Sequence, residues 1–90
     1  MKTFEMSVRE TFYLKGLTIF MGPVSPDVGF IRRCDCELVA NGRVMAQFSI
    51  EGEAHPLPED PMRRSIATKQ PVDLGSLGLG PSGFIIRSRD

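Results

Sequence analysis

The sequence is poor in the side chains that metal sites and many catalytic sites use. One histidine, His55, and two cysteines, Cys34 and Cys36, are its only imidazole and thiol groups. A tetrahedral zinc site takes four ligands, so these three fall short unless Asp35 turns from the opposite face of its strand. No serine or cysteine motif accompanies His55 to make it a general base. We expect no catalytic residue, no metal and no cofactor, and an enzyme built on these groups is the least favoured alternative.

The chain also has no excess of positive or negative charge and no long apolar segment. Lys and Arg number 11, as do Asp and Glu, so no overall field draws the chain to nucleic acid or to an acidic membrane. No window approaches ~18 apolar residues, and the charged residues 1–10 do not resemble a signal peptide. Cysteines two positions apart on a strand lie about 6.5 Å apart with parallel side chains, a poor disulfide geometry. We expect a soluble, reduced, cytoplasmic protein with no membrane partner.

The chain does contain many residues that interrupt secondary structure, and this favours short strands. Its 7 prolines and 9 glycines occur at short intervals and disfavour long helices. Most even positions of residues 4–14 are apolar, as in a half-buried strand: Phe4, Met6, Val8, Phe12 and Leu14. Glu10 is the exception, and a carboxylate at an inward position indicates a bend or a barrel rim. After a turn at Lys15-Gly16, the predicted inward face continues through Leu17, Ile19 and Met21.

Residues 34–50 predict a second hairpin around Asn41-Gly42. A two-residue turn would place Asp35 and Glu37 beside the core, whereas a three-residue loop, residues 40–42, with a bulge at the glycine avoids this. Because a slip of one residue moves a whole strand to its other face, the second register is favoured. Its inward residues are Cys34, Cys36, Leu38, Val44, Ala46, Phe48 and Ile50. We interpret both thiols as small buried side chains.

The remainder predicts loops and two short strands. Residues 51–65 are a proline-rich loop excursion, with one helical turn begun by Asp60 and Pro61. Residues 65–74 predict a short strand, and residues 84–89 a last one that turns Phe84 and Ile86, or Ile85 alone, inward. We expect a single all-β domain, residues 1–90, with six or seven strands and no long helix.

Several of these segments share their spacing with a known family. The matching positions in the first hairpin are Val8, Glu10, Phe12, Leu14, Gly16, Gly22 and Val24. Further matches are Gly29, Ile31, Arg32, Asp35, Leu38, Phe48, Ile50 and Glu51, with residues 80–87 as a closing strand. Together they resemble the second domain of elongation factor Tu and related translation GTPases. Cys34, Pro23 and residues 67–81 depart from the family pattern.

The resemblance implies a small antiparallel β-barrel, closed or partly open and Greek-key-like. No Gly-x-x-x-x-Gly-Lys-Ser/Thr motif occurs, so the family's GTPase domain is missing and no nucleotide is expected. In the parent proteins this domain packs against the GTPase domain and touches RNA or the aminoacyl end of tRNA. None of those contacts falls on a named residue of this chain.

Two binding surfaces follow from the predicted faces. The candidate partner-binding residues are Tyr13, Phe20, Arg32, Arg33, Arg87 and Arg89. The two aromatics are predicted to point outward from the first hairpin, toward a protein partner or a second copy. The arginines would suit RNA if they converged on one rim. We expect a non-enzymatic binding module for protein–protein interaction or scaffolding, with translation-associated RNA binding as the alternative.

Overall fold

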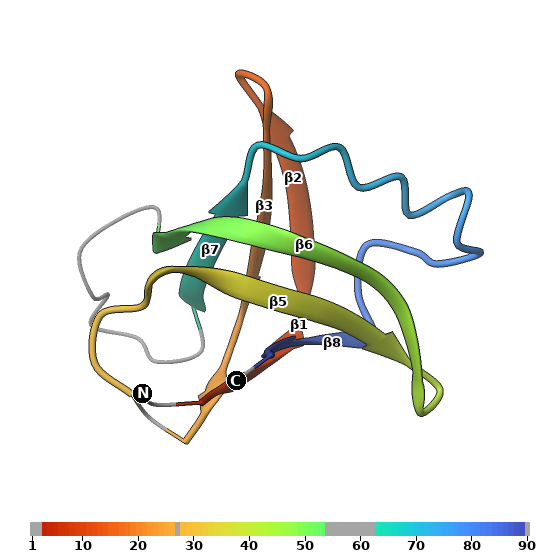
Figure 1. The fold of residues 1–90 in the computed structure, drawn as a ribbon. Helices are drawn as coiled ribbons and strands as arrows, with labels where there is room; N and C mark the ends of the chain where they lie inside the picture. The colour runs from red at the N-terminus through yellow and green to blue at the C-terminus, as the bar shows by residue number, and fades with distance from the viewer. Residues whose placement is uncertain (1–2, 27, 54–62, 90) are drawn as a thin grey trace.

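The computed structural model describes residues 3–26, 28–53 and 63–89. These residues form one antiparallel sheet of eight strands and no α-helix (Figure 1). The strands are β1 (Glu5–Val8), β2 (Glu10–Leu14), β3 (Leu17–Gly22), β4 (Val24–Ser25), β5 (Arg32–Ala40), β6 (Arg43–Glu53), β7 (Arg64–Thr68) and β8 (Phe84–Ser88). Their order is β2-β3-β7-β6-β5-β8-β1-β4, which leaves β2 and β4 at the ends of an open sheet. The all-β prediction is confirmed, with eight strands in place of six or seven because Arg9 divides the predicted strand of residues 4–14 and β4 follows Pro23, beyond the end of the predicted hairpin.

The first hairpin contains an extra residue at Arg9. Met6 and Glu10 are four positions apart, whereas their partners Val24 and Met21 are three apart. The Arg9 N–H donates to Met21 O at 2.8 Å, so Arg9 and Glu10 both face Met21. This arrangement is a β-bulge, and it changes the inward positions from even-numbered before it to odd-numbered after it. The irregularity that the sequence predicts at Glu10 is this bulge.

Phe20 is therefore a core residue and not an outward aromatic. It is fully buried, with its ring centroid 5.9 Å from those of Phe48 and Phe84. The first ring stacks on Phe20 and the second meets it edge to face, the two arrangements that aromatic pairs prefer. The prediction that Phe20 binds a partner is wrong.

The opposite face of the hairpin, predicted to be inward, faces outward. Phe12 and Leu14 are exposed, and across the strand pair Leu17, Ile19 and Met21 are only half-buried. Phe12 is opposite Ile19 and Leu14 is opposite Leu17. We call these five residues the outer hairpin face.

The second hairpin has the predicted faces but a different bulge. Its turn residues Asn41 and Gly42 have φ of 53° and 75°, the two positive values of a two-residue type I′ turn. Val39 then pairs with Val44 while Leu38 pairs with Ala46, so the extra residue lies after the turn, between Val44 and Ala46. The predicted register pairs Leu38 with Val44, so the observed pairing is shifted by two residues, and a shift of two keeps each side chain beyond the bulge on its predicted face. Cys36, Leu38, Phe48 and Ile50 are buried, and Cys34 and Ala46 are half-buried. The prediction that Val44 faces inward is wrong, because Val44 pairs with Val39 before the bulge and is exposed.

The remaining strands complete the core. β8 turns Phe84 and Ile86 inward, the first of the two predicted alternatives. The fully buried hydrophobic side chains are Met6, Phe20, Cys36, Leu38, Ile50, Ile66 and Ile86. β6 extends to Glu53 and β7 begins at Arg64, so both ends of the predicted loop 51–65 belong to strands. The helical turn predicted at Asp60 lies outside the described residues.

A buried ion pair joins the ends of β6 and β7 to the preceding loop. The side chains of Arg64 and Glu53 are 2% and 1% exposed, and Arg64 Nη2 lies 2.5 Å from Glu53 Oε1. The guanidinium also donates to Val28 O at 2.6 Å and to Gly29 O at 2.8 Å. Glu53 Oε1 accepts the Ile31 N–H at 2.9 Å. These hydrogen bonds offset the desolvation of both charges and fix residues 28–31 against the sheet.

Candidate functional site

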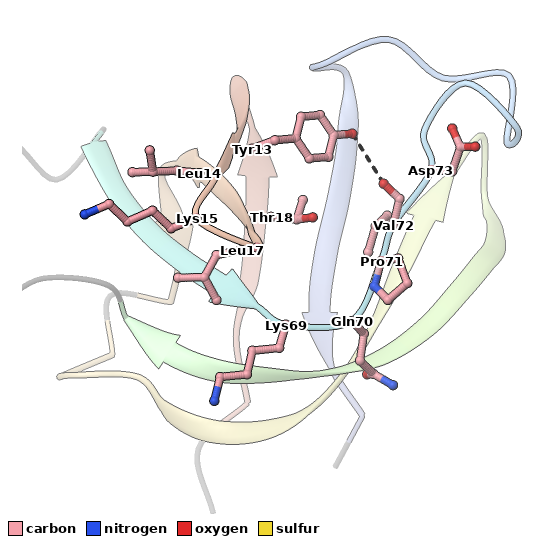
Figure 2. A pocket seen from close by; sticks show the side chains of 11 residues that line it. Tyr13, Leu14, Lys15, Leu17, Thr18, Lys69, Gln70, Pro71, Val72 and Asp73 are labelled. Atoms are coloured by element: carbon pink, nitrogen blue, oxygen red, sulfur yellow. Dashed lines mark hydrogen bonds between the residues drawn. The ribbon is translucent and has the colours of Figure 1, made fainter.

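Tyr13 lies beside a hollow at the tip of the first hairpin. Its side chain is on the inner face of β2, yet it is 64% exposed because the hairpin projects beyond the curved β5 and β6 (Figure 1). Its hydroxyl donates to Val72 O at 3.3 Å (Figure 2). The hollow measures about 510 Å³ and is lined by residues 13–18 and 69–73. We call it the Tyr13 hollow; its volume is in the range of small-ligand sites.

The two sides of the Tyr13 hollow differ in charge. Figure 2 shows Lys15 and Lys69 on one side, and Val72 and Asp73 on the other. The Asp73 carboxylate is already engaged, since it accepts the Ser76 hydroxyl at 2.7 Å and the Ser76 N–H at 3.2 Å. These two bonds hold the pKa of Asp73 below its ordinary value. Asp73 therefore stays ionised at neutral pH, and the hollow carries positive charge on the lysine side and negative charge on the other.

The outer hairpin face is an exposed apolar surface. Phe12 and Leu14 are 43% and 56% exposed, and their cross-strand neighbours extend the apolar surface over β3. Glu10, also exposed, stands at its border opposite Met21. Contiguous apolar residues at the surface of a small domain mark interaction sites more often than scattered ones do.

The backbone of β2 adds an unpaired edge. Among the strands of the described residues, β2 pairs with β3 alone. Lys15 and Gly16 have φ of 51° and 79°, which makes the connection a type I′ turn closed by the pair Leu14 and Leu17. Since bonded and non-bonded pairs alternate in an antiparallel ladder, Thr11 and Tyr13 direct their N–H and C=O groups away from β3. An edge of this kind can accept a further strand.

The predicted arginine cluster is divided between two faces. Arg33, Arg87 and Arg89 lie on the outer face of β5 and β8, whereas Arg32 precedes Arg33 on β5 and points to the other side.

Two of these arginines also have carboxylate partners. Arg33 Nη2 lies 2.6 Å from Glu51 Oε1, and Arg87 Nε lies 2.6 Å from Glu37 Oε1. The structure thus does not bring Arg32, Arg87 and Arg89 together on one rim, and it neutralises part of the positive charge of the outer face.

The two thiols lie at the inner face of β5. Cys36 is fully buried and Cys34 is half-buried, with their sulfur atoms 3.8 Å apart. Among the described residues, no group of three or more His, Cys, Asp or Glu side chains is placed to hold a metal ion. His55 lies outside the described residues.

Thiol labelling measures this burial directly. In a Cys34→Ser variant we expect Cys36 to react with a disulfide reagent at least about 100-fold more slowly in the folded than in the unfolded protein, because access needs an opening of the core. In a Cys36→Ser variant, the half-buried Cys34 should react faster than Cys36 does. Rapid native labelling of Cys36 would contradict a packing role and favour thiol chemistry.

No protein-family model, curated protein or solved structure matches this chain. In the parts of the chain that the structure describes, no helix has the length and apolarity that a membrane span requires. Support for a function therefore comes from the geometry of the described residues.

The sequence predicts Tyr13 as a candidate residue but does not predict the outer hairpin face. The alternation of residues 4–14 continues in the sequence across the bulge, so the sequence predicts Phe12 and Leu14 to face inward together with Phe4, Met6 and Val8. The one available signal was Glu10, whose carboxylate does not fit an inward position. An extra residue near Glu10 exposes Phe12 and Leu14 and makes them part of the candidate site.

Proposed function

We propose that this protein is a non-enzymatic module that binds other proteins through the β2–β3 hairpin. The observation that carries the proposal is the exposure of three consecutive large side chains, Phe12, Tyr13 and Leu14, on a strand at the end of the sheet. One side of this strand presents the outer hairpin face and the other presents Tyr13 at the hollow, which Leu14 and Leu17 also border. Its edge offers unpaired backbone groups. A protein partner is able to use all three, since protein interfaces combine apolar anchors with hydrogen bonds.

We also propose that the sheet is a six-stranded barrel, as its resemblance to the second domain of elongation factor Tu implies. Arg9 alone separates β1 from β2, and Pro23 alone separates β3 from β4. If each pair is one bent strand, the pairings run from β1/β2 to β3/β4, β7, β6, β5, β8 and back to β1. The Ser7 N–H donates to Pro23 O at 3.0 Å, which joins the two bent strands beside the second break. These pairings support the proposed barrel, whose rim would include the hairpin tip.

Site-specific crosslinking tests the proposed function. A photo-reactive phenylalanine in place of Phe12 should form a discrete protein adduct in an extract of the source cells. Excess unlabelled protein should displace the adduct, and a Phe12→Ser/Leu14→Ser variant should not. The matched control is the same photo-reactive residue at Val44, which is 45% exposed on the other hairpin. Equal adducts at both positions, or adducts that the double variant also displaces, would contradict the proposal.

RNA binding is the second candidate, because Arg33, Arg87 and Arg89 share one face. Phosphate contacts by arginine release counterions, so the affinity for bulk RNA should fall steeply as salt is raised. Binding that does not weaken with salt, or no binding at low salt, removes this candidate. Mixed charge on the face, with Glu37 and Glu51 each 2.6 Å from an arginine, makes it the weaker of the two.

A further inference from the structure

We infer that the Tyr13 hollow binds a peptide segment in which a large apolar side chain stands next to an acidic one. The inference rests on the proposed protein-binding function and names the chemistry of the partner at one part of the hairpin. It is carried by the shape of the hollow, its apolar lining and the placement of two lysines on a single side.

The hollow is built to take an apolar group. Leu17 and Thr18 form its wall on β3, Pro71 and Val72 form the facing wall, and the ring of Tyr13 covers the space between them (Figure 2). The hydrogen bond from the Tyr13 hydroxyl to Val72 O ties the two walls together without the help of a ligand. A site that is formed before binding loses less conformational entropy when a ligand enters.

The charges at the hollow favour a carboxylate on one side of it. Lys15 is exposed, forms no ion pair with any residue that the structure describes, and sits at a turn position that the type I′ geometry fixes. Lys69 is 72% exposed, and its ammonium lies 3.9 Å from Glu51. Glu51 is shared with Arg33 at 2.6 Å, so the long, exposed contact to Lys69 contributes little and leaves that ammonium available.

The acidic group on the opposite side of the hollow is Asp73. It stays ionised, with hydrogen bonds from Ser76 to both oxygens at 2.7 and 3.2 Å, and it is exposed, so solvent screens its repulsion of a distant ligand carboxylate. A ligand carboxylate on the lysine side is separated from Asp73 by the width of the hollow (Figure 2). Charge complementarity therefore selects an acidic segment, and the apolar lining selects the side chain beside the acid.

Tyr13 makes the test direct, because it is the only tyrosine and the chain has no tryptophan. Its fluorescence reports on the hollow without any label. The probe is the synthetic peptide acetyl-Gly-Asp-Leu-Phe-Asp-Gly-amide, and the control is the same peptide with both aspartates changed to asparagine. We expect the acidic peptide to change Tyr13 emission saturably at or below about 1 mM, and the asparagine peptide to bind about tenfold more weakly.

Charge-reversal variants separate the lysines from general charge effects. A Lys15→Glu/Lys69→Glu variant should bind the acidic peptide about tenfold more weakly than the unchanged protein. The matched control, Arg43→Glu, alters an exposed cation on the other hairpin and should bind the peptide as the unchanged protein does. Circular dichroism spectra of the variants should overlay that of the unchanged protein.

Four outcomes overturn the inference: no saturation near that concentration, equal binding of the asparagine peptide, equal loss in Arg43→Glu, or a short single-stranded RNA acting at lower concentration than the peptide. The crosslinking residue, Phe12, does not line the hollow, so an adduct there and the peptide titration report on different surfaces. A displaceable adduct without peptide binding leaves the proposed function standing and removes only the acidic-segment inference. Peptide binding without an adduct supports the inference at the hollow and contradicts binding through the outer hairpin face.

Discussion

Replacing Arg64 with methionine is expected to lower the free energy of unfolding by about 3–5 kcal/mol. The change leaves the Glu53 carboxylate, 1% exposed, without the guanidinium that lies 2.5 Å away. It also removes the donors to Val28 O and Gly29 O. Small domains are stable by about 5–15 kcal/mol, so the variant should lose a large part of its stability.

Urea unfolding followed by circular dichroism measures this loss. Arg33→Met is the matched control, because its ion pair with Glu51 at 2.6 Å is at the surface and should contribute no more than about 1 kcal/mol. A Glu53→Leu/Arg64→Met variant should be more stable than Arg64→Met alone, since no buried charge is left unpaired. Equal losses in Arg64→Met and Arg33→Met would show that the buried pair is not what fixes residues 28–31.

Replacing Gly22 with alanine is expected to lower the free energy of unfolding by about 3 kcal/mol, the upper end of the usual cost of overpacking a core. Gly22 is buried where β3 passes β1, and an added Cβ would lie 2.0 Å from Ser7 O. The obstructing atom belongs to the backbone, so no side-chain rotation relieves the contact. The strands must separate at the point where the Ser7 N–H bonds Pro23 O.

Thermal and urea unfolding of the Gly22→Ala variant check this expectation. The control is Gly80→Ala, because an added Cβ at Gly80 meets no atom within 4 Å; its stability should change by no more than about 0.5 kcal/mol. If both variants unfold at the same urea concentration, the close approach of β3 to β1 is looser than described.

The faces of the second hairpin were predictable although its register was not. The sequence indicates a bulge at Gly42, and the structure has a two-residue turn with the bulge after Val44. The predicted loop pairs Leu38 with Val44, whereas the structure pairs it with Ala46. Because side chains alternate with a period of two, this shift of two residues leaves the buried thiols and the outward acids on the faces that the sequence predicts.

The first hairpin was not predictable in the same way, because both of its faces are apolar. On β3, Leu17, Ile19 and Met21 alternate with a set that contains Phe20, and hydrophobicity alone favours the set that faces outward. The choice is made by contacts distant in sequence, such as those of Phe20 with Phe48 and Phe84. Local periodicity carries no information about such contacts.

The buried ion pair also escapes sequence reasoning. Arg64 and Glu53 lie at the two ends of a stretch that reads as solvated, proline-rich loop, and charged residues there are usually exposed. They meet because β6 and β7 are neighbours in the sheet, with Glu53 opposite Ile66. Only the strand pairing, which the sequence does not contain in any local pattern, predicts this contact.

The bulge at Arg9 affects how this chain would align with related sequences. Without Arg9, Val8 and Glu10 would stand opposite Gly22 and Met21 in an unbroken ladder, with the same side chains inside. Gain or loss of one codon at this point is therefore nearly silent in three dimensions. In an alignment of hydrophobic patterns, the same event would put the segment before it out of phase with everything that follows.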